Sequence, residues 1–354
     1  MKLRIGVSGA GGFSRSFIPL FKAHPLVDDV AVADLLPERA AEAARAFNLK
    51  RTFGSHEELC DAELDAVAIF TQRHLHGPQG IAALRAGKHV YCAVPISQSL
   101  DDIAEVIRLA EQTRLVYMMG ETSYYYPSTL YCRARFTKGD FGRFVYGEAQ
   151  YIHDMDHGFY GSFQRSGGAE WKRVAGIPPM LYPTHSVSMI LSVTGARASQ
   201  VSCLGWEDRH DDGVFRVGAN LWDNRFSNEV GLMRTSDGGM MRIGEFRRLG
   251  WLGMNSVHMR FYGTEGSFEE HGGSQVWVGR AREHLTDVTQ LLTCTPSIRH
   301  GAEPEEHGVL ARDFHSGLSR VHPAARLPVE FKGASQRPLR LSPVPGRRLR
   351  QIGG

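Results

Sequence analysis

Apolar and polar positions in the first 120 residues form short β-branched runs that alternate with segments of helical period. Such an alternation is typical of β-α-β units, whose strands pair in parallel. We therefore expect an α/β domain with a doubly wound parallel sheet over residues 1–120. The expected strands cover residues 3–7, 30–33, 66–70, 89–92 and 115–119, and the expected helices cover residues 14–23, 37–47, 78–86 and 100–111.

The pattern changes after residue 120. A helix expected over residues 127–138 is followed by long alternating runs, separated by turn pairs such as Asp237-Gly238 and Gly272-Gly273. Alternation with such turns predicts an antiparallel sheet. Residues 121–332 are therefore expected to form an α+β domain with a large, mostly antiparallel open sheet and one helix, residues 184–193, among its strands. The expected strands cover residues 144–152, 198–204, 218–223, 229–235, 239–246, 256–262 and 275–278.

The chain length agrees with two domains, because 354 residues exceed what one hydrophobic core usually serves. The net charge of +3 depends on five arginines in residues 333–354, a segment without acids, so the rest of the chain carries −2. This basic tail is predicted to be disordered, either as a natural flexible end or because a closing helix has been lost. The slightly acidic body gives no support for a nucleic-acid surface.

Cysteine usage and hydropathy bear on the compartment. The chain has five cysteines without a C-x-x-C pair, and an odd number cannot all be paired within one chain, which favours a reducing compartment. Residues 1–7 do not have the pattern of a leader peptide, and no stretch approaches the roughly 20 apolar residues that span a bilayer. We expect a soluble cytoplasmic protein with no membrane partner.

A glycine-rich turn follows the first expected strand and opens the first helix. In a dinucleotide-binding turn, Gly9 would make the tight turn, Gly11 would let the backbone approach a pyrophosphate, and Ser14 would pack the helix on the strand. Asp34 ends the second strand, and a carboxylate there suits a ribose diol and repels a 2′-phosphate. The motif predicts NAD rather than NADP, although Arg39 keeps NADP open. The cofactor-binding residues of this turn are Gly9, Ala10, Gly11, Gly12, Phe13 and Ser14.

A second segment, residues 71–78, follows the strand at 66–70. Open α/β sheets bind ligands at the carboxyl ends of their strands. We therefore expect Thr71 at the cofactor and either His74 or His76 against its nicotinamide half. Equally, one of these histidines would only cap the helix that enters at Pro78.

With these motifs the chain resembles the Gfo/Idh/MocA oxidoreductase family over nearly all of residues 1–332. The resemblance implies a Rossmann domain that binds NAD(P), and a second domain whose sheet covers the nicotinamide and forms the contact of a homo-oligomer. It also implies that Val94, Pro95 and Glu121 lie at the cofactor. The residues that carry it are 9–14, Asp34, 71–78, 87–95 and 182–185.

One departure from the family pattern concerns the chemistry. Typical dehydrogenases of the family have Glu-Lys-Pro where this chain has Ala93-Val94-Pro95, and an Asp where it has Leu181. Because valine cannot exchange a proton, the usual acid/base scheme cannot operate unchanged.

Within the family, the chain is similar to the NAD-dependent glycoside hydrolases of the α-N-acetylgalactosaminidase type, which also have valine before that proline. Glu121, Tyr151-Ile-His153 and Tyr182-Pro-Thr-His185 occur in the same order. The similarity implies a carbohydrate or glycoside substrate whose C3 hydroxyl is oxidised, followed by loss of the C2 proton, elimination, addition of water and return of the hydride. The implied catalytic residues are Tyr151, His153, Tyr182 and His185.

Each of these residues also has a structural interpretation. His185 would cap the helix that follows it, and Tyr151 and His153 would be ordinary residues on one face of a strand. Tyr124-Tyr125-Tyr126 would pack a domain junction rather than stack on a sugar.

Further charged residues have similar alternatives. The segment from His153 to His157 lacks the additional ligands that zinc requires, so no metal is expected. Arg165, Lys172 and Arg173 would bind an anionic sugar group or simply face solvent. For the whole protein, the alternatives are a simple NAD(P)-linked sugar or inositol dehydrogenase and a non-catalytic NAD-binding sensor.

Overall fold

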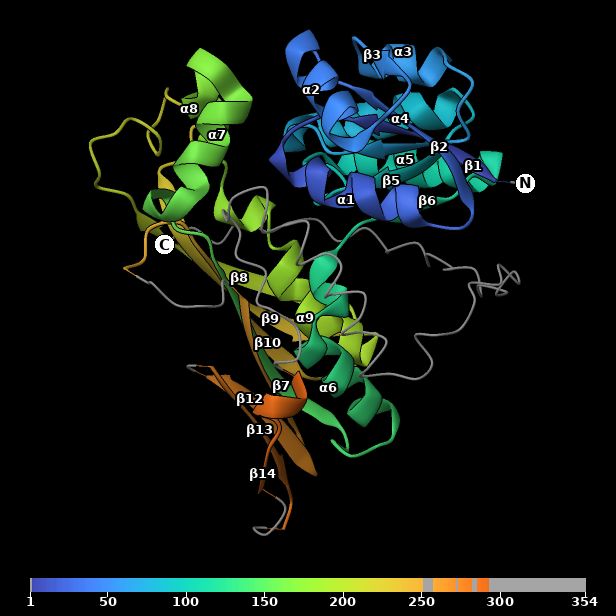
Figure 1. The fold of residues 1–354 in the computed structure, drawn as a ribbon. Coiled ribbons are helices and arrows are strands. Elements are labelled where there is room, and N and C mark those ends of the chain that lie inside the picture. Colours follow the sequence, from blue (N-terminus) through green and yellow to red (C-terminus); the bar gives the residue numbers. More distant parts are fainter. Residues whose placement is uncertain (1, 251–256, 272, 282–284, 293–354) are drawn as a thin grey trace.

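The computed structural model describes residues 2–250, 257–271, 273–281 and 285–292, so the predicted basic tail, 333–354, lies outside the described residues. Two sheets form the fold, a parallel one in the first part of the chain and a mostly antiparallel one in the second (Figure 1). The expected fold class is confirmed. The domain limits at residues 120 and 332 stay predictions.

The first sheet has the strand order β3-β2-β1-β4-β5-β6, and all its pairs are parallel. Ile5, Val7 and Ile18 belong to the core on one side, and Ile69, Leu84 and other apolar residues form a second core, so helices cover both faces. The strands are β1 (Leu3–Ser8), β2 (Val27–Ala33), β3 (Thr52–Phe53), β4 (Ala66–Ile69), β5 (His89–Cys92) and β6 (Tyr117–Met119). The helices are α1 (Gly12–Ala23), α2 (Pro37–Phe47), α3 (His56–Asp61), α4 (His76–Arg85) and α5 (Leu100–Thr113).

The second sheet has the order β14-β13-β12-β11-β7-β10-β9-β8, with one parallel pair, β7 and β10. Its core joins the sheet to α6 and α9, which lie against one face (Figure 1). The strands are β7 (Phe144–Ile152), β8 (Ala198–Glu207), β9 (Phe226–Thr235), β10 (Met240–Phe246), β11 (Val257–Gly263), β12 (Gly266–His271), β13 (Ser274–Gly279) and β14 (Leu285–Asp287). The helices are α6 (Pro127–Thr137), α7 (Tyr160–Gly167), α8 (Trp171–Ala175), α9 (Thr184–Thr194) and α10 (Thr289–Leu292).

The structure corrects two expectations for the second part of the chain. Residues 218–223 form turns rather than a strand, because the Asn220 side chain bonds the backbone of Val214 and Asn224 and so offers the chain an alternative to sheet pairing. The helix expected over residues 184–193 is confirmed as α9, but the expectation of a single helix among the strands is wrong, since α7 and α8 precede it. Smaller elements, including β3, α3, β12 and β14, were not predicted.

Helix α7 lies on the side of the second part of the chain that is near helix α2 (Figure 1). The Arg39 guanidinium donates to the carbonyl of Arg165, and the Gln72 amide donates to the carbonyl of Ser166 over 2.8 Å. The loop after β4 and helix α2 are thereby tied to the second part of the chain. Among the described residues, no helix is both long and apolar enough to cross a membrane.

Candidate active site

The turn between β1 and α1 forms a cradle with open space above its glycines. Gly9 has φ +95°, and an added Cβ there would lie 2.9 Å from the carbonyl oxygen of Phe70. A Cβ on Gly11 or Gly12 would meet nothing within 4 Å, and no described side chain caps the first turn of α1. Uncapped amides at a helix N-terminus bind phosphate. The residues present therefore fit the pyrophosphate of a dinucleotide.

Asp34 lies directly beside this cradle. Its Oδ2 accepts from the Ala10 amide over 2.9 Å and its Oδ1 from the Leu36 amide over 3.0 Å. An ionised carboxylate has about four acceptor positions, so Asp34 still has acceptor capacity for a ribose hydroxyl. Ser14 is buried and donates to the carbonyl of Gly11 over 2.9 Å, a bond within the turn that begins α1. The Phe13 ring is 43% exposed and packs edge-on against Phe17.

The two histidines after β4 occupy different environments. His76 is buried, and its ring nitrogens lie 2.8 Å from the carbonyl oxygen of Pro95 and 3.1 Å from that of Thr71. Through these two contacts His76 links two loops at the sheet edge. Burial lowers the pKa of its imidazole. His74 is half-buried and, with Gln72 and other residues, lines a cavity of about 230 Å³. The expected contact of either histidine with nicotinamide stays a prediction.

A buried chain of polar side chains joins the end of β6 to the start of α9. His185, in the first turn of α9, is 3% exposed, and its Nδ1 lies 2.7 Å from Oε1 of Glu121. Its Nε2 lies 3.1 Å from the Tyr182 hydroxyl. Burial by itself would raise the pKa of the Glu121 carboxyl, but His185 and the Ser123 amide hold that pKa below its usual value. No described side chain caps α9, whose N-cap is Pro183, so the structure does not support the interpretation of His185 as a helix cap.

Tyr151 and His153 continue this cluster from the end of β7. The Tyr151 hydroxyl lies 2.6 Å from His153 Nδ1, and the Tyr151 ring lies edge-on to His185 with 4.9 Å between the ring centroids. Burial raises the pKa of Tyr151, against the opposing effect of the Arg247 charge. The His153 ring stacks on the Phe159 ring, with 3.7 Å between the ring centroids, and is partly exposed. The four residues expected to be catalytic are thus brought together.

Sequence reasoning missed a buried Glu–Arg pair that lies under this cluster. Glu245 on β10 is fully buried, accepts from the Ser186 hydroxyl and lies 3.2 Å from the Arg247 guanidinium. Burial raises the pKa of Glu245 to about 8. The available signal was the alternation of Met241, Ile243 and Glu245 on the buried face, where an acid takes a place that the pattern reserves for an apolar side chain.

Val94, the departure from the family pattern, is 6% exposed and belongs to the same core cluster as Tyr151 and Tyr182. No proton can be exchanged from this position. The candidate proton-exchanging groups are instead the imidazoles and phenols of the cluster.

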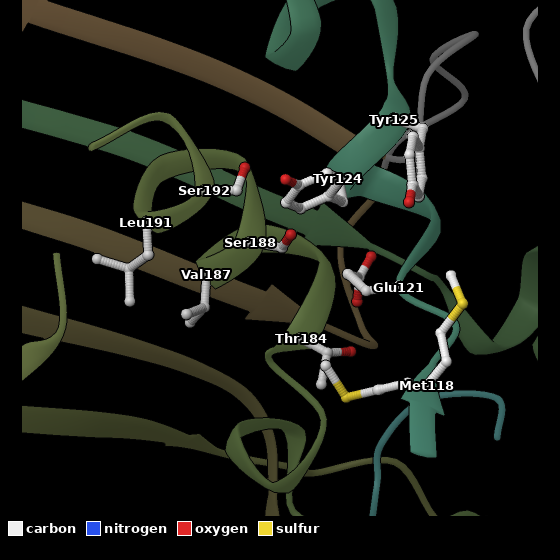
Figure 2. A pocket seen from close by; sticks show the side chains of 10 residues that line it. Met118, Glu121, Tyr124, Tyr125, Thr184, Val187, Ser188, Leu191 and Ser192 are labelled. Atoms are coloured by element: carbon white, nitrogen blue, oxygen red, sulfur yellow. The ribbon is translucent and has the colours of Figure 1, made fainter. Parts of the chain in front are cut away.

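A pocket of about 510 Å³ borders Glu121 from another direction (Figure 2). Tyr124 and Tyr125 line it together with residues of β6 and α9, and Arg133 lies 3.7 Å from the Tyr124 ring centroid. Both tyrosines are about two-fifths exposed, so these rings face the pocket as well as their neighbours.

The segment after His153 makes hydrogen bonds that hold the local backbone. Asp154 accepts from the amides of Asp156 and Leu249. Within the described ranges, no group of three or more His, Cys, Asp and Glu side chains is arranged to hold a metal ion.

A strand, a glycine turn with open space, an uncapped helix and an acid after the second strand together define an NAD-binding Rossmann domain. Residues 3–121 match the model of the Gfo/Idh/MocA family, described as an oxidoreductase family with an NAD-binding Rossmann fold. This match confirms, over the first part of the chain, the resemblance drawn from the motifs.

Curated relatives and solved structures extend this similarity. A glycosyl hydrolase family 109 protein of Saccharopolyspora erythraea is 28% identical over 204 residues, 53% of this chain and 43% of that protein. A 4-carboxy-2-hydroxymuconate-6-semialdehyde dehydrogenase of a Sphingobium species is 32% identical over 139 residues, 39% of this chain and 44% of that protein. The chain spans about half the length of the curated relatives it matches.

The fold is also that of a levoglucosan dehydrogenase solved with NADH and levoglucosan. That structure aligns with a TM-score of 0.66 at 19% identity, over 91% of this chain and 90% of the other. The likeness supports the two-sheet architecture.

Proposed function

We propose that this protein is an NAD-dependent enzyme that oxidises a carbohydrate hydroxyl as the internal first step of glycoside cleavage by elimination. The observation that carries the proposal is the buried chain of Glu121, His185 and Tyr182 beside Val94. It supplies an imidazole and a phenol where the family's lysine is missing. The glycosyl hydrolase relative, whose matched region covers 53% of this chain, supports glycoside cleavage.

NAD fits this chain better than NADP. The Asp34 carboxylate lies at the cradle, where it would accept from ribose hydroxyls and repel a 2′-phosphate. When bound, NAD would serve as the hydride acceptor for the oxidation and give the hydride back at the end.

The proton steps fall to two pairs of side chains. His185, supported by Glu121 at Nδ1, would take the C3 hydroxyl proton through the Tyr182 phenol at Nε2. The resulting ketone acidifies the C2 proton. His153 is the partly exposed member of the cluster, and with Tyr151 it would remove that proton or assist the leaving group.

A second candidate is a net sugar dehydrogenase, favoured by the fold shared with levoglucosan dehydrogenase. It would use the same His185 and Tyr182 but release NADH. A non-catalytic NAD sensor would need none of the buried proton-exchanging contacts.

We also propose a homo-oligomer formed through the second sheet. Strand β8 is at the sheet edge, and all its residues are exposed. Leu204 is 81% exposed, and Leu232 on the neighbouring strand is 59% exposed. An apolar surface of this kind is typical of a protein contact.

The experiment uses the NAD-loaded protein and 4-nitrophenyl glycosides in D₂O. Elimination predicts release of nitrophenol without accumulating NADH and with deuterium at C2 of the product. Stoichiometric NADH with an oxidised sugar would indicate the dehydrogenase instead. Product without deuterium at C2 would contradict the elimination route.

A further inference from the structure

Arg73 brings a cation to the aromatic wall of the candidate site. It begins the short helix η1 (Arg73–Leu75), directly after β4. Its guanidinium carbon lies 4.4 Å from the ring centroid of Tyr182 and 5.4 Å from those of Phe159 and Phe163. Ring contacts of this kind hold a planar guanidinium in a fixed orientation. A residue of the first sheet's loop is thereby placed against the side chains proposed to carry the chemistry.

Two neighbouring arginines are paired with acids, and Arg73 differs from them. Arg247 lies 3.2 Å from Glu245, and Arg248 lies 3.2 Å from Asp208. Among the residues that the structure describes, no carboxylate lies within ion-pair distance of the Arg73 guanidinium. The Glu121 carboxylate bonds His185 and the Ser123 amide through Oε1.

A half-buried cation without an anionic partner is costly, and a bound anion would relieve that cost. The guanidinium presents its N–H donors as a planar fork that matches the two oxygens of a carboxylate. Since the fork is held over Tyr182, an anion bound to it would lie next to the phenol that contacts His185.

We propose that Arg73 binds a carboxylate of the substrate, so that the carbohydrate is an acidic sugar such as a uronic acid or its glycoside. This inference rests on the proposed function and names its substrate class. Arg73 acts here as a specificity-determining residue that binds the carboxylate on C5, and the C3 hydroxyl of the same ring is presented to Tyr182 and His185.

The test compares the NAD-loaded full chain on two matched probes, 4-nitrophenyl glucuronide and 4-nitrophenyl glucoside, each as both anomers. The wild type should prefer the glucuronide in kcat/KM by at least about tenfold. Arg73→Gln should lower kcat/KM for the glucuronide by about 10- to 100-fold, the range expected for a lost charge-assisted bond, and leave the glucoside unchanged. Arg73→Lys should keep part of the preference, because it retains the charge but not the fork.

Arg135→Gln is the matched control. Arg135 is on α6 and also lies over an aromatic ring, 4.5 Å from the centroid of Trp277, but outside the site. This variant should keep the glucuronide preference. A wild-type preference for the glucoside would overturn the proposal, as would equal losses on both probes in Arg73→Gln, because Arg73 would then act on Tyr182 and not on the substrate.

Calorimetry separates failure of this inference from failure of the proposed function. If neither probe is cleaved, the glycosidase proposal fails, and binding of glucuronate to the NAD-loaded protein still tests Arg73. Binding that is lost in Arg73→Gln and kept in Arg135→Gln supports the carboxylate site. Absent binding, or equal binding in all three proteins, contradicts it.

Discussion

The cofactor cradle and the buried polar cluster are built in opposite ways. The cradle uses consecutive residues, 9–14, and offers backbone amides and open space above Gly11 and Gly12. The cluster uses buried side chains from the end of β6, from β7 and from α9. Backbone amides do not titrate, whereas every link in the cluster depends on which side chain holds a proton. Binding and chemistry should therefore respond to different substitutions.

The largest expected effect separates the two regions at His185. His185→Ala should lower turnover by roughly 10²–10⁴, the usual contribution of a general acid or base, and leave NAD affinity unchanged. Steady-state kinetics on a cleaved glycoside and NAD titration by fluorescence measure the two quantities.

His185→Gln is the matched variant for this prediction. Glutamine keeps a hydrogen-bonding side chain beside Glu121 and Tyr182 but does not exchange a proton at neutral pH. It should be as inactive as the alanine variant and more stable. Full turnover in His185→Gln would reduce His185 to a structural residue.

An intermediate effect concerns the cradle, where two glycines are needed for different reasons. Gly11→Ala should weaken NAD binding by about 1–3 kcal/mol, because the new methyl enters the space of the pyrophosphate, with little change in the free energy of unfolding. Gly9→Ala should instead destabilise the fold by about 1–3 kcal/mol, because φ is +95° and Phe70 is too close.

Gly250→Ala, outside the cradle, controls for the added methyl group. Its Cβ meets nothing and its φ is ordinary. Urea unfolding and NAD titration of the three variants test the assignment. If Gly11→Ala bound NAD as tightly as the wild type, the cradle would be only a structural turn.

The smallest expected effect is a pH dependence confined to the cluster. Burial raises the pKa of Glu245 from 4.5 to about 8, so the folded protein holds a proton that the unfolded chain releases above about pH 4.5. The free energy of unfolding should therefore fall as the pH rises through this range. Between pH 6 and 8.5 this decrease should be smaller in Glu245→Gln than in the wild type by at least about 1 kcal/mol. Urea unfolding at several pH values measures it, with the exposed Glu63→Gln as control. Parallel slopes in wild type and Glu245→Gln would show that Glu245 is ionised when buried.

The cofactor half could be predicted from the sequence because its determinants are local. The turn from Gly9 to Ser14 and the position of Asp34 follow from chain order alone, and the structure brings Asp34 to within 2.9 Å of the Ala10 amide. Residues 218–223 show the limit of pattern reading. Their alternation suggested a strand, but the side-chain bonds of Asn220 made turns.

The two-sheet fold class, the glycine cradle and the residue types available for chemistry could be inferred from the chain alone, because periodicity and turn motifs act between neighbouring residues. Only the tertiary structure decided that His185 meets Glu121 across 64 residues, that Arg247 and Glu245 lie beneath Tyr151, and that Arg73 crosses to Tyr182 without an acidic partner among the described residues. The physical reason is that a buried polar group is defined by its partners, and these partners come from strands and helices whose packing no local pattern specifies.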